Sequence, residues 1–234
     1  MANRVLELLA RLSPGLPDPL PENPVGLLET WQREAIHASS VPNPTAVVLA
    51  TSSAEADPSG RVVLCRGLDS ANGTMTYFTN LVSRKAADVG ANPRAEAVFF
   101  WDHDSRQARL HGPVTAVGEE EAQAYFASRP LLSRLGAWAS DQSQPLESRA
   151  ALAERLLAVM DRFGVSLTDL ALSRHTPSVP KPPHWGGFRL WADRVELWTM
   201  GAGRLHDRAE WRRTLTAIAE GFDGTPWRST RLCP

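Results

Sequence analysis

Residues 46–117 contain five apolar, β-branched runs: AVVLAT (46–51), RVVLCRG (61–67), MTYFTN (75–80), AEAVFFW (95–101) and QARLHGPVTAV (107–117). Each run has the length and composition of a strand and is bounded by turn residues. Asn72-Gly73 supplies the positive φ angles of a tight turn, which predicts a hairpin over residues 69–73 between the second and third strands. Strands in such close succession predict a meander that closes into a barrel.

The segments outside this core add helices and more strands. Helical spacing of apolar residues, Pro-containing ends and an N-cap at Ser148 predict helices over residues 25–38, 83–91, 119–127 and 148–163. Residues 164–183 are rich in Pro, Ser and Thr and predict a long loop. Further strands are expected over residues 187–191, 194–198 and 227–232. The fold class is therefore mainly β with α, a β-barrel plus helices.

The N-terminal segment differs from the rest of the chain. Residues 1–12 have the spacing of a short amphipathic helix, and the PGLPDPLPENP that follows is too rich in proline for regular structure. We expect residues 1–23 to form a flexible arm and residues 24–234 to form a single domain, a length that one β-barrel domain can occupy.

Charge balance and cysteine content indicate which binding partners and which cellular location to expect. Lys plus Arg (25) nearly equals Asp plus Glu (26), so no overall field favours nucleic acid or a membrane surface, and neither partner is expected. The chain has two cysteines in unlike contexts, Cys65 in an apolar run and Cys233 beside the C-terminal proline, which indicates neither a disulfide framework nor a metal site. No signal peptide or membrane span is recognisable, and a cytoplasmic location is expected.

Two groups of residues are candidates for phosphate binding. Ser83-Arg84-Lys85 opens a predicted helix directly after a strand, where backbone N–H groups, a hydroxyl and two cations can converge on a phosphate. The alternative is an N-cap followed by solvated charges. Tyr125, Arg129 and Ser133 recur at intervals of four residues, which suits a second phosphate if the helix continues past Pro130 or ends nearby. The alternative is a helix-end cation with an ordinary cap.

A third group lies near the C-terminus, in the sequence RLHDR at 204–208. An extended backbone would direct Arg204, His206 and Arg208 to one face, which favours an anionic or electron-rich target. Trp198 could offer a flat apolar surface to a ring system, although core packing is the common role of a tryptophan.

Taken together, these segments resemble the pyridoxine/pyridoxamine 5'-phosphate oxidase family. The stretches that carry the resemblance are RVVLCRGLD, YFTNLVSRKAADVGANPRA, YFASRPLLSRLGAWASDQSQPL, PPHWGGFRL, VELWTMGAGRLHDR and the terminal RLCP, in the family's order from about residue 24 onward. The resemblance implies an FMN-binding split β-barrel that forms a homodimer, with the FMN sites at the interface between subunits. The loop 164–183 and the segment 211–226 are longer than expected for the family.

The resemblance also implies roles for individual residues. The residues expected to bind FMN are Arg61, Val62, Val63, Leu64, Cys65, Arg66, Phe78, Thr79, Ser83, Arg84, Lys85, Gln107, Gln142, Ser143, Trp198 and Arg208. The residues expected to bind the substrate are Arg66, Tyr125, Arg129, Ser133, Arg204 and His206. Arg204 and His206 are also the expected catalytic residues, and no metal is expected.

The activity implied is that of a pyridoxal 5'-phosphate synthase, an oxidase acting on a small phosphorylated pyridine. Pyridoxine 5'-phosphate and pyridoxamine 5'-phosphate would be oxidised to pyridoxal 5'-phosphate, with O2 as acceptor, giving H2O2 and, from the amine, ammonia. The main alternative is a specialised FMN-dependent oxidase of secondary metabolism that resembles the phenazine-biosynthesis flavin oxidases. A non-catalytic flavin or pyridoxal-phosphate binding protein is a third reading, and a flavin reductase would need a nicotinamide site, for which the sequence has no glycine-rich fingerprint.

Overall fold

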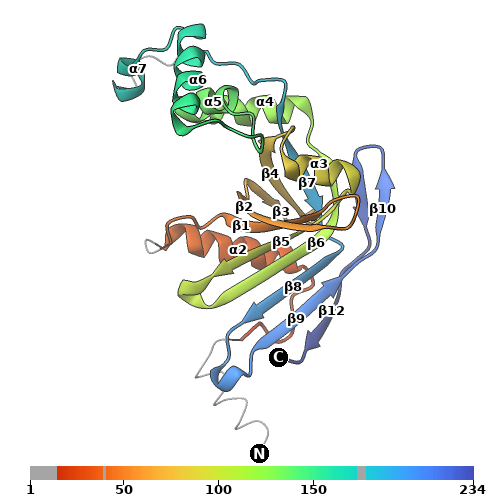
Figure 1. The fold of residues 1–234 in the computed structure, drawn as a ribbon. Coiled ribbons are helices and arrows are strands. Elements are labelled where there is room, and N and C mark those ends of the chain that lie inside the picture. Colours follow the sequence, from red (N-terminus) through yellow and green to blue (C-terminus); the bar gives the residue numbers. More distant parts are fainter. Residues whose placement is uncertain (1–14, 39–40, 173–177) are drawn as a thin grey trace, which may run out of the picture. The chain divides into compact units, whose positions relative to one another are not determined.

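The computed structural model describes residues 15–38, 41–172 and 178–234 (Figure 1). These residues divide into two compact units. The first unit comprises the described residues up to Tyr77, together with Asn92–Thr115 and Arg189–Pro234. The second unit comprises Phe78–Ala91 and Ala116–Phe188. The expected class, mainly β with helices, is confirmed.

An antiparallel sheet forms the body of the first unit. Its strands follow the order β12-β9-β8-β6-β5-β1-β2. The bounds are β1 (Ala46–Ser52), β2 (Pro58–Leu64), β5 (Arg94–Trp101), β6 (Arg106–Ala116), β8 (Arg194–Thr199), β9 (Asp207–Arg212) and β12 (Arg228–Leu232).

One face of this sheet is the core of the first unit. Side chains alternate along the strands, so Leu49, Phe99, Leu110 and Leu197 are fully buried on the same face. Helix α2 (Pro24–His37) contacts β8 and β3 and buries Leu28 and Trp31, among others. The side chain of Asn23 caps the helix by accepting a hydrogen bond from the Val25 N–H at 3.0 Å.

The region after β2 corrects two expectations. The single strand expected over residues 61–67 is two strands, β2 and β3 (Gly67–Asp69), because the chain leaves the sheet at Cys65 and Arg66. The expected hairpin is present, but it joins β3 to β4 (Thr74–Asn80). Of the two turn residues, Gly73 has a positive φ of 64°, whereas Asn72 does not.

Asp69 fixes this turn through its carboxylate. Its Oδ1 accepts hydrogen bonds from the backbone N–H groups of Ala71 (2.9 Å) and Asn72 (3.2 Å), and its Oδ2 accepts one from the Asn72 side chain at 2.7 Å. The bond from the Asn72 side chain is the main reason why the pKa of Asp69 lies below its ordinary value.

The expected meander in sequence order is wrong. Strand β1 pairs with both β2 and β5, whereas β4 pairs with β3 and with β7 (Trp185–Trp191). A two-stranded hairpin of β10 (Leu215–Ile218) and β11 (Gly221–Gly224) lies outside the large sheet. Short 3-10 helices cover Asp102–Asp104 (η1) and Ala202–Arg204 (η2).

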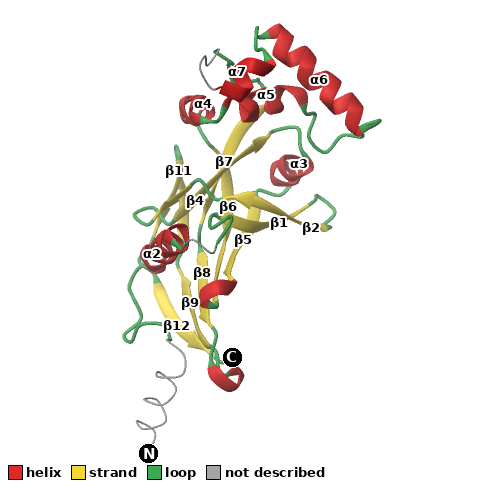
Figure 2. Cartoon of the chain, turned by 90° about the vertical axis from the view of Figure 1, so that its left-hand side faces the viewer, coloured by secondary structure: helices red, strands yellow, loops and turns green. Residues whose placement is uncertain are grey.

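The second unit is mainly helical (Figure 2). Its helices are α3 (Arg84–Ala91), α4 (Glu119–Ser128), α5 (Leu131–Ala139), α6 (Arg149–Arg162) and α7 (Leu167–Leu172). Ser148 caps α6 as expected, since its hydroxyl accepts a hydrogen bond from the Ala151 N–H at 3.0 Å. The sequence did not predict α5, and the loop expected over residues 164–183 contains α7. Burial of Leu135, Met160 and Val165 in one cluster explains why these short segments are ordered.

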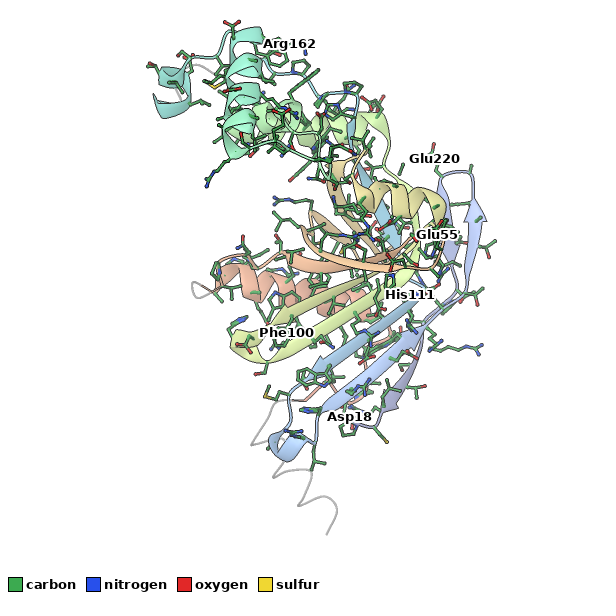
Figure 3. All side chains as sticks on the ribbon, in the orientation of Figure 1. Asp18, Glu55, Phe100, His111, Arg162 and Glu220 are labelled. Atoms are coloured by element: carbon green, nitrogen blue, oxygen red, sulfur yellow. The ribbon has the colours of Figure 1, made fainter. Side chains whose placement is uncertain are left out.

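The described part of the expected arm, residues 15–23, contains no helix or strand but contacts the first unit. The Leu16 N–H donates to Asp207 Oδ2 at 2.8 Å, and the Trp211 indole donates to the Pro21 carbonyl at 2.8 Å. Asp18, labelled in Figure 3, lies 3.8 Å from the Arg231 guanidinium. The helix expected over residues 1–12 lies outside the described residues. Among the described helices, none is long and apolar enough to span a membrane.

Candidate active site

The expected site residues are divided between the two units, and each group is described within its own unit. The second unit holds Phe78, Thr79, Ser83, Arg84, Lys85, Tyr125, Arg129, Ser133, Gln142 and Ser143. The first unit holds Arg61 to Arg66, Gln107, Trp198, Arg204, His206 and Arg208.

Lys85 is the centre of the first group. Its side chain is buried, and its ammonium group donates to the hydroxyl oxygens of Thr79 (3.1 Å) and Ser83 (3.0 Å) and to the amide oxygen of Gln142. Thr79 comes from the end of β4, Ser83 immediately precedes α3, and Gln142 comes from the loop after α5. Residues 63 positions apart in the chain, Thr79 and Gln142, are thereby brought together by one cation.

The start of α3 completes this cluster. The Arg84 N–H donates to the Ser143 hydroxyl at 3.3 Å, and Ser143 adopts a positive φ of 73°. An ammonium group, hydroxyls and a helix N-terminus are the donors that bind phosphate oxygens in proteins. The donor set therefore fits the phosphate of a nucleotide-like cofactor.

Tyr125 and Arg129 belong to an aromatic cluster of the second unit. The rings of Phe78 and Tyr125 stack with centroids 4.1 Å apart, and those of Phe78 and Trp185 stack 5.4 Å apart. The Arg129 guanidinium lies 5.0 Å from the centroid of the Trp185 ring, within range of a cation–π contact. The sequence did not identify Trp185 as a site residue, and its only signal was the match of PPHWGGFRL to the family.

The chain turns between Tyr125 and Ser133. Helix α4 ends at Ser128, Arg129 has extended φ and ψ angles of −72° and 147°, and Pro130 caps the next helix, α5. Tyr125 and Ser133 are therefore on different helices. Of the two geometries considered, the helix that ends near Pro130 is the observed one, because proline disfavours helical angles in the residue before it.

Arg61 is fixed on the sheet of the first unit. Its guanidinium donates to the Thr51 hydroxyl (2.6 Å), the Ser59 hydroxyl (2.7 Å) and the Leu49 carbonyl (3.2 Å). The Arg66 side chain, by contrast, is exposed. Cys65 between them is buried, and burial raises the pKa of its thiol to about 11.

Gln107, Trp198 and Arg208 form one row across the sheet. Gln107 is the register partner of Trp198, and Trp198 is the partner of Arg208. Directly opposed residues of antiparallel strands point to the same face, so the three side chains are neighbours. Glu196, which sequence reasoning missed, holds Arg208 in place through an ion pair of 2.9 Å.

The extended backbone expected over residues 204–208 is wrong. Residues Ala202–Arg204 form the 3-10 turn η2, with positive φ values at Gly203 (62°) and Arg204 (66°), and β9 begins only at Asp207. Arg204, His206 and Arg208 therefore do not alternate along one strand. The glycines of the preceding MGAG segment allow this turn, which periodicity alone did not reveal.

His206 is nevertheless held in a defined orientation. Its Nδ1 accepts a hydrogen bond from the Gly201 N–H at 3.2 Å, so the neutral ring carries its proton on Nε2. Its ring lies 4.7 Å from the Trp198 ring. Gly201 is required here, because a Cβ at this position would lie 1.8 Å from the Leu205 carbonyl oxygen. The turn thus fixes both the ring and the tautomer of His206.

The large antiparallel sheet of the first unit and the helices of the second are typical of the split-barrel class of proteins. Residues 33–160 match the family model described as pyridoxamine 5'-phosphate oxidase. Residues 185–234 match the model described as the pyridoxine 5'-phosphate oxidase C-terminal dimerisation region. The chain belongs to the pyridoxine/pyridoxamine 5'-phosphate oxidase family.

Relatives with this name are similar over most of the chain. The pyridoxine/pyridoxamine 5'-phosphate oxidase of Paraburkholderia phymatum is 40% identical over 212 residues, which cover 91% of this chain and 89% of the relative. The protein of the same name from Burkholderia orbicola is 41% identical over the same shares of each chain.

Solved structures share the fold. PhzG from Burkholderia lata 383, in complex with tetrahydrophenazine-1-carboxylic acid, has a TM-score of 0.75 and 27% identity, over 92% of this chain and 94% of that chain. A pyridoxamine 5'-phosphate oxidase-related, FMN binding protein from Nostoc punctiforme has a TM-score of 0.65 and 16% identity, over 89% of this chain and 96% of that chain. The sequence-based recognition of the family is confirmed.

Proposed function

We propose that the protein is an FMN-dependent oxidase that converts pyridoxine 5'-phosphate and pyridoxamine 5'-phosphate to pyridoxal 5'-phosphate. The observation that carries this proposal is the buried Lys85 ammonium group surrounded by the oxygens of Thr79, Ser83 and Gln142. A buried cation with several polar neighbours is costly to maintain in a protein interior, and a phosphate ligand gives it a function.

The cofactor phosphate would be bound by the residues around α3. Lys85 and Arg84 would supply positive charge, and the hydroxyls of Ser83 and Ser143 would supply hydrogen bonds. Arg61 would contribute from β2, and the row of Gln107, Trp198 and Arg208 would contact other parts of the cofactor. When bound, FMN would accept two electrons from the substrate and pass them to O2, which is reduced to H2O2.

The substrate phosphate would be bound by Tyr125, Arg129 and Ser133, with Arg66 as a further cation. Tyr125 stacks on Phe78, and Arg129 lies over the Trp185 ring. These contacts restrict the side-chain conformations of the phenol and the guanidinium. Binding energy from a remote phosphate can orient the reacting carbon, C4', without taking part in the chemistry.

Arg204 and His206 would face the pyridine ring and its reacting substituent. Because His206 Nδ1 is occupied by the Gly201 N–H, the Nε2–H is left to donate a hydrogen bond to the substrate. Oxidation at C4' removes two electrons and two protons from the alcohol, giving the aldehyde directly. The amine gives an imine, which water hydrolyses to the aldehyde and ammonia.

The protein would act as a homodimer with the cofactor sites at the subunit interface. Support comes from the match of residues 185–234 to a dimerisation region. It also comes from the outer face of the sheet, where Val48 and Val62 are register partners and remain 45% and 65% exposed. Large exposed apolar side chains at adjacent positions are typical of an interaction surface.

A specialised oxidase of a reduced tricyclic metabolite is the second candidate, favoured by the likeness to PhzG at a TM-score of 0.75. The presence of Tyr125, Arg129 and Ser133 argues for a phosphorylated substrate instead, since a substrate without phosphate has no need of all three residues. The 40% identity to the pyridoxine/pyridoxamine 5'-phosphate oxidase of Paraburkholderia phymatum supports the same choice.

A comparison of substrates tests the proposal. The purified protein with FMN should consume O2 and form pyridoxal 5'-phosphate when given pyridoxine 5'-phosphate, and should turn over unphosphorylated pyridoxine much more slowly at equal concentration. Equal rates for both alcohols would refute the phosphate site, and oxidation of a reduced phenazine alone would favour the second candidate.

A further inference from the structure

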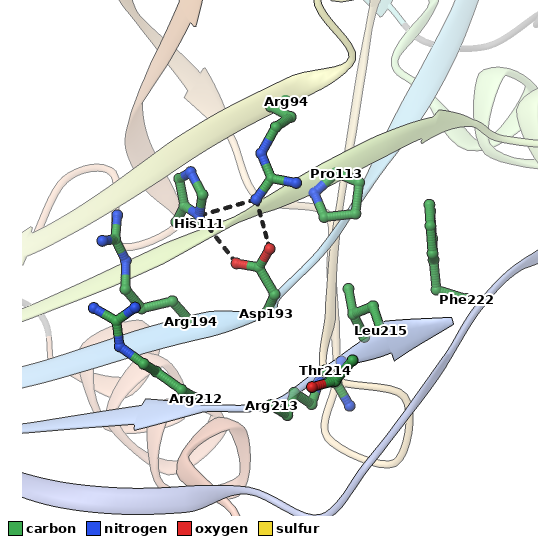
Figure 4. Close-up of a pocket in the computed structure, with 10 residues that line it drawn as sticks. All are labelled: Arg94, His111, Pro113, Asp193, Arg194, Arg212, Arg213, Thr214, Leu215 and Phe222. Carbon is green, nitrogen blue, oxygen red and sulfur yellow. Dashed lines mark hydrogen bonds and ion pairs between the residues drawn. The ribbon is translucent and has the colours of Figure 1, made fainter. Parts of the chain in front are cut away.

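A pocket of about 500 Å³ lies in the first unit, apart from every residue assigned to the cofactor or substrate (Figure 4). This volume is within the range of small-molecule sites. Its walls come from the ends of β5, β6, β8 and β9 and from the β10–β11 hairpin. The hairpin is formed by β10 (Leu215–Ile218) and β11 (Gly221–Gly224).

The polar side of the pocket is a row of basic residues across the sheet. His111 is the register partner of Arg194, Arg194 is the partner of Arg212, and Arg212 is the partner of Arg228. Like charges at directly opposed positions destabilise a sheet. In Figure 4 the side chains of Arg194 and Arg212 extend from adjacent strands to the same side.

Acidic groups offset only part of this charge. Asp193 lies between Arg94, at 2.5 Å, and His111, at 3.0 Å, while Arg212 is paired with Glu210 at 2.5 Å. The Glu96 carboxylate lies 3.9 Å from the Arg194 guanidinium. Among the residues that line the pocket, four are arginines and one is an aspartate, so the lining has an excess of positive charge.

The other side of the pocket is apolar and closely packed against the sheet. Leu215 and Phe222 of the hairpin stand on the opposite side of Asp193 from Arg194 and Arg212 in Figure 4. The Phe222 ring packs edge-on against Trp191, with centroids 5.9 Å apart. Gly221 has a φ of 106°, and a Cβ there would lie 2.1 Å from the Trp191 ring, so the hairpin approaches the sheet as closely as its backbone allows.

Arg213 fixes the base of the same hairpin. Its guanidinium donates to the backbone carbonyls of Ala192 and Asn72, both at 2.7 Å, and stacks 4.3 Å from the Trp227 ring. Burial lowers the pKa of Arg213 below its ordinary value, in keeping with this structural use. The apolar wall is therefore held in place from both ends.

We propose that this pocket binds a small organic anion, with its phosphate or carboxylate group at Arg194 and Arg212 and its apolar body against Leu215 and Phe222. Two guanidinium groups on adjacent strands suit a doubly charged oxyanion. An apolar wall on the other side selects a ligand that carries a ring or a hydrocarbon portion rather than a bare inorganic ion. The site is additional to the proposed active site, because the two have no residue in common.

Phenyl phosphate is a suitable probe, since it combines a dianion with a flat apolar ring. In a nuclear magnetic resonance titration of the FMN-loaded protein, the amide signals of Leu215 and Phe222 should shift and saturate. Phenyl phosphate should bind this pocket several-fold more tightly than inorganic phosphate. Equal affinity for the two anions would overturn the assignment of the apolar wall.

Variants that remove the charges of Arg194 and Arg212 test whether phenyl phosphate binds at these two residues. The double substitution Arg194→Gln and Arg212→Gln should weaken phenyl phosphate binding at Leu215 and Phe222 by about tenfold or more, as expected for lost charge-assisted contacts. The amide of Ser133, in the proposed substrate site, should titrate as in the unmodified protein. A control with Arg33→Gln and Arg149→Gln, which removes the same charge from exposed positions, should bind as tightly as the parent.

A second variant guards against misfolding of the first. Leu215→Ser leaves the arginines in place and should weaken phenyl phosphate several-fold while inorganic phosphate binding is unchanged. The proposal is overturned if the Leu215 and Phe222 signals do not move with phenyl phosphate, or if they move equally in the double variant. It is also overturned if these signals respond to protein concentration instead of ligand, because a second copy of the chain would then cover the basic row.

Discussion

Lys85 is the residue on which the proposed cofactor site depends most, because it links Thr79, Ser83 and Gln142 through one buried ammonium group. Lys85→Met keeps the length of the side chain and removes the charge. We expect the dissociation constant for FMN to rise by about tenfold or more, since a hydrogen bond to a charged group contributes about 1.5–3 kcal/mol. Quenching of flavin fluorescence on binding measures this constant.

Lys181 provides the matched control, since it is the only other lysine of the chain. Its side chain is also largely buried, and it donates to the Trp185 carbonyl at 2.9 Å. Lys181→Met should leave FMN affinity within about twofold of the parent, because its contacts lie outside the Lys85 cluster. An equal loss of affinity in both variants would mean that Lys85 acts through stability and not through the phosphate.

Cys65 gives a prediction about pH. Burial raises the pKa of its thiol from 9.0 to about 11, so at pH 9 the folded protein should react with iodoacetamide at Cys65 roughly fiftyfold more slowly than the urea-unfolded chain. Since the pKa is higher in the folded state, ionisation favours unfolding. The stability associated with this thiol is complete below about pH 9 and is lost as the pH rises towards 11, at a cost of up to about 3 kcal/mol.

Peptide mass spectrometry can follow the two cysteines in one experiment. Cys233 is exposed and serves as the internal control, which should be alkylated in the folded protein. Alkylation of Cys65 at the same rate before and after unfolding would show that its side chain is accessible in solution.

At the scale of elements, the stack of Phe78, Tyr125 and Trp185 connects β4, α4 and β7 and determines where Arg129 lies. Trp185→Leu removes the aromatic surface under the guanidinium. We expect the KM for pyridoxine 5'-phosphate to rise by about tenfold with a smaller change in kcat, in line with the loss of a partly desolvated cation–π contact. Steady-state kinetics measure both constants.

Two further variants make this test specific. Trp185→Phe keeps an aromatic ring under the guanidinium. Its KM for pyridoxine 5'-phosphate should therefore stay close to that of the parent protein. Trp138→Leu makes the same change in a tryptophan of the same unit that packs on Phe163, and should lower stability without raising the KM. A rise in KM in both leucine variants alike would assign the effect to general loosening of the unit.

Sequence patterns were sufficient for most elements and insufficient for their pairing. Apolar, β-branched runs bounded by turn residues located β1, β5, β6 and β8, and the Ser148 cap located the start of α6. The same signal failed at residues 61–67, where Cys65 and Arg66 leave the sheet although the composition favours a continuous strand. Helix α5 was missed because Gly136 and its short length give it little intrinsic stability, and Leu135 is ordered by packing against Met160.

Some residues of the candidate site were predicted from the sequence, and others were not. Motif recognition assigned Thr79, Ser83, Lys85 and Gln142 to one cofactor site, and the structure brings these four side chains together. The turn at Arg204 was not predicted, because a positive φ in a non-glycine residue leaves no signal in hydrophobic periodicity. Trp185 and Glu196 were also missed, since their roles depend on the long-range contacts with Arg129 and Arg208.

At the scale of the whole molecule, the proposed cofactor site is formed by two copies of the chain. Val62 and Phe100 are 65% and 55% exposed on the outer face of the sheet in the first unit. Val62→Glu would place a charge on this face, and we expect the variant to be a monomer of 25.6 kDa where the parent has twice that mass. Sedimentation equilibrium measures the mass directly.

Ile36→Glu is the matched control, because Ile36 is 52% exposed on α2, outside the sheet. It should leave the dimer intact. FMN affinity should stay unchanged in Ile36→Glu. It should fall in Val62→Glu, where loss of the partner subunit and loss of the expected Val62 contact with FMN both contribute, so the mass is the deciding measurement. A parent protein that sediments as a monomer, or a Val62→Glu dimer, would contradict this surface as the interface.

The most direct test of the proposed activity is anaerobic mixing of the FMN-loaded protein with pyridoxine 5'-phosphate, followed by absorbance at the visible flavin bands. We predict that the flavin absorbance is lost, that pyridoxal 5'-phosphate appears in equal amount, and that the absorbance returns when air is admitted. A flavin that stays oxidised with pyridoxine 5'-phosphate and with pyridoxamine 5'-phosphate would contradict the proposed function.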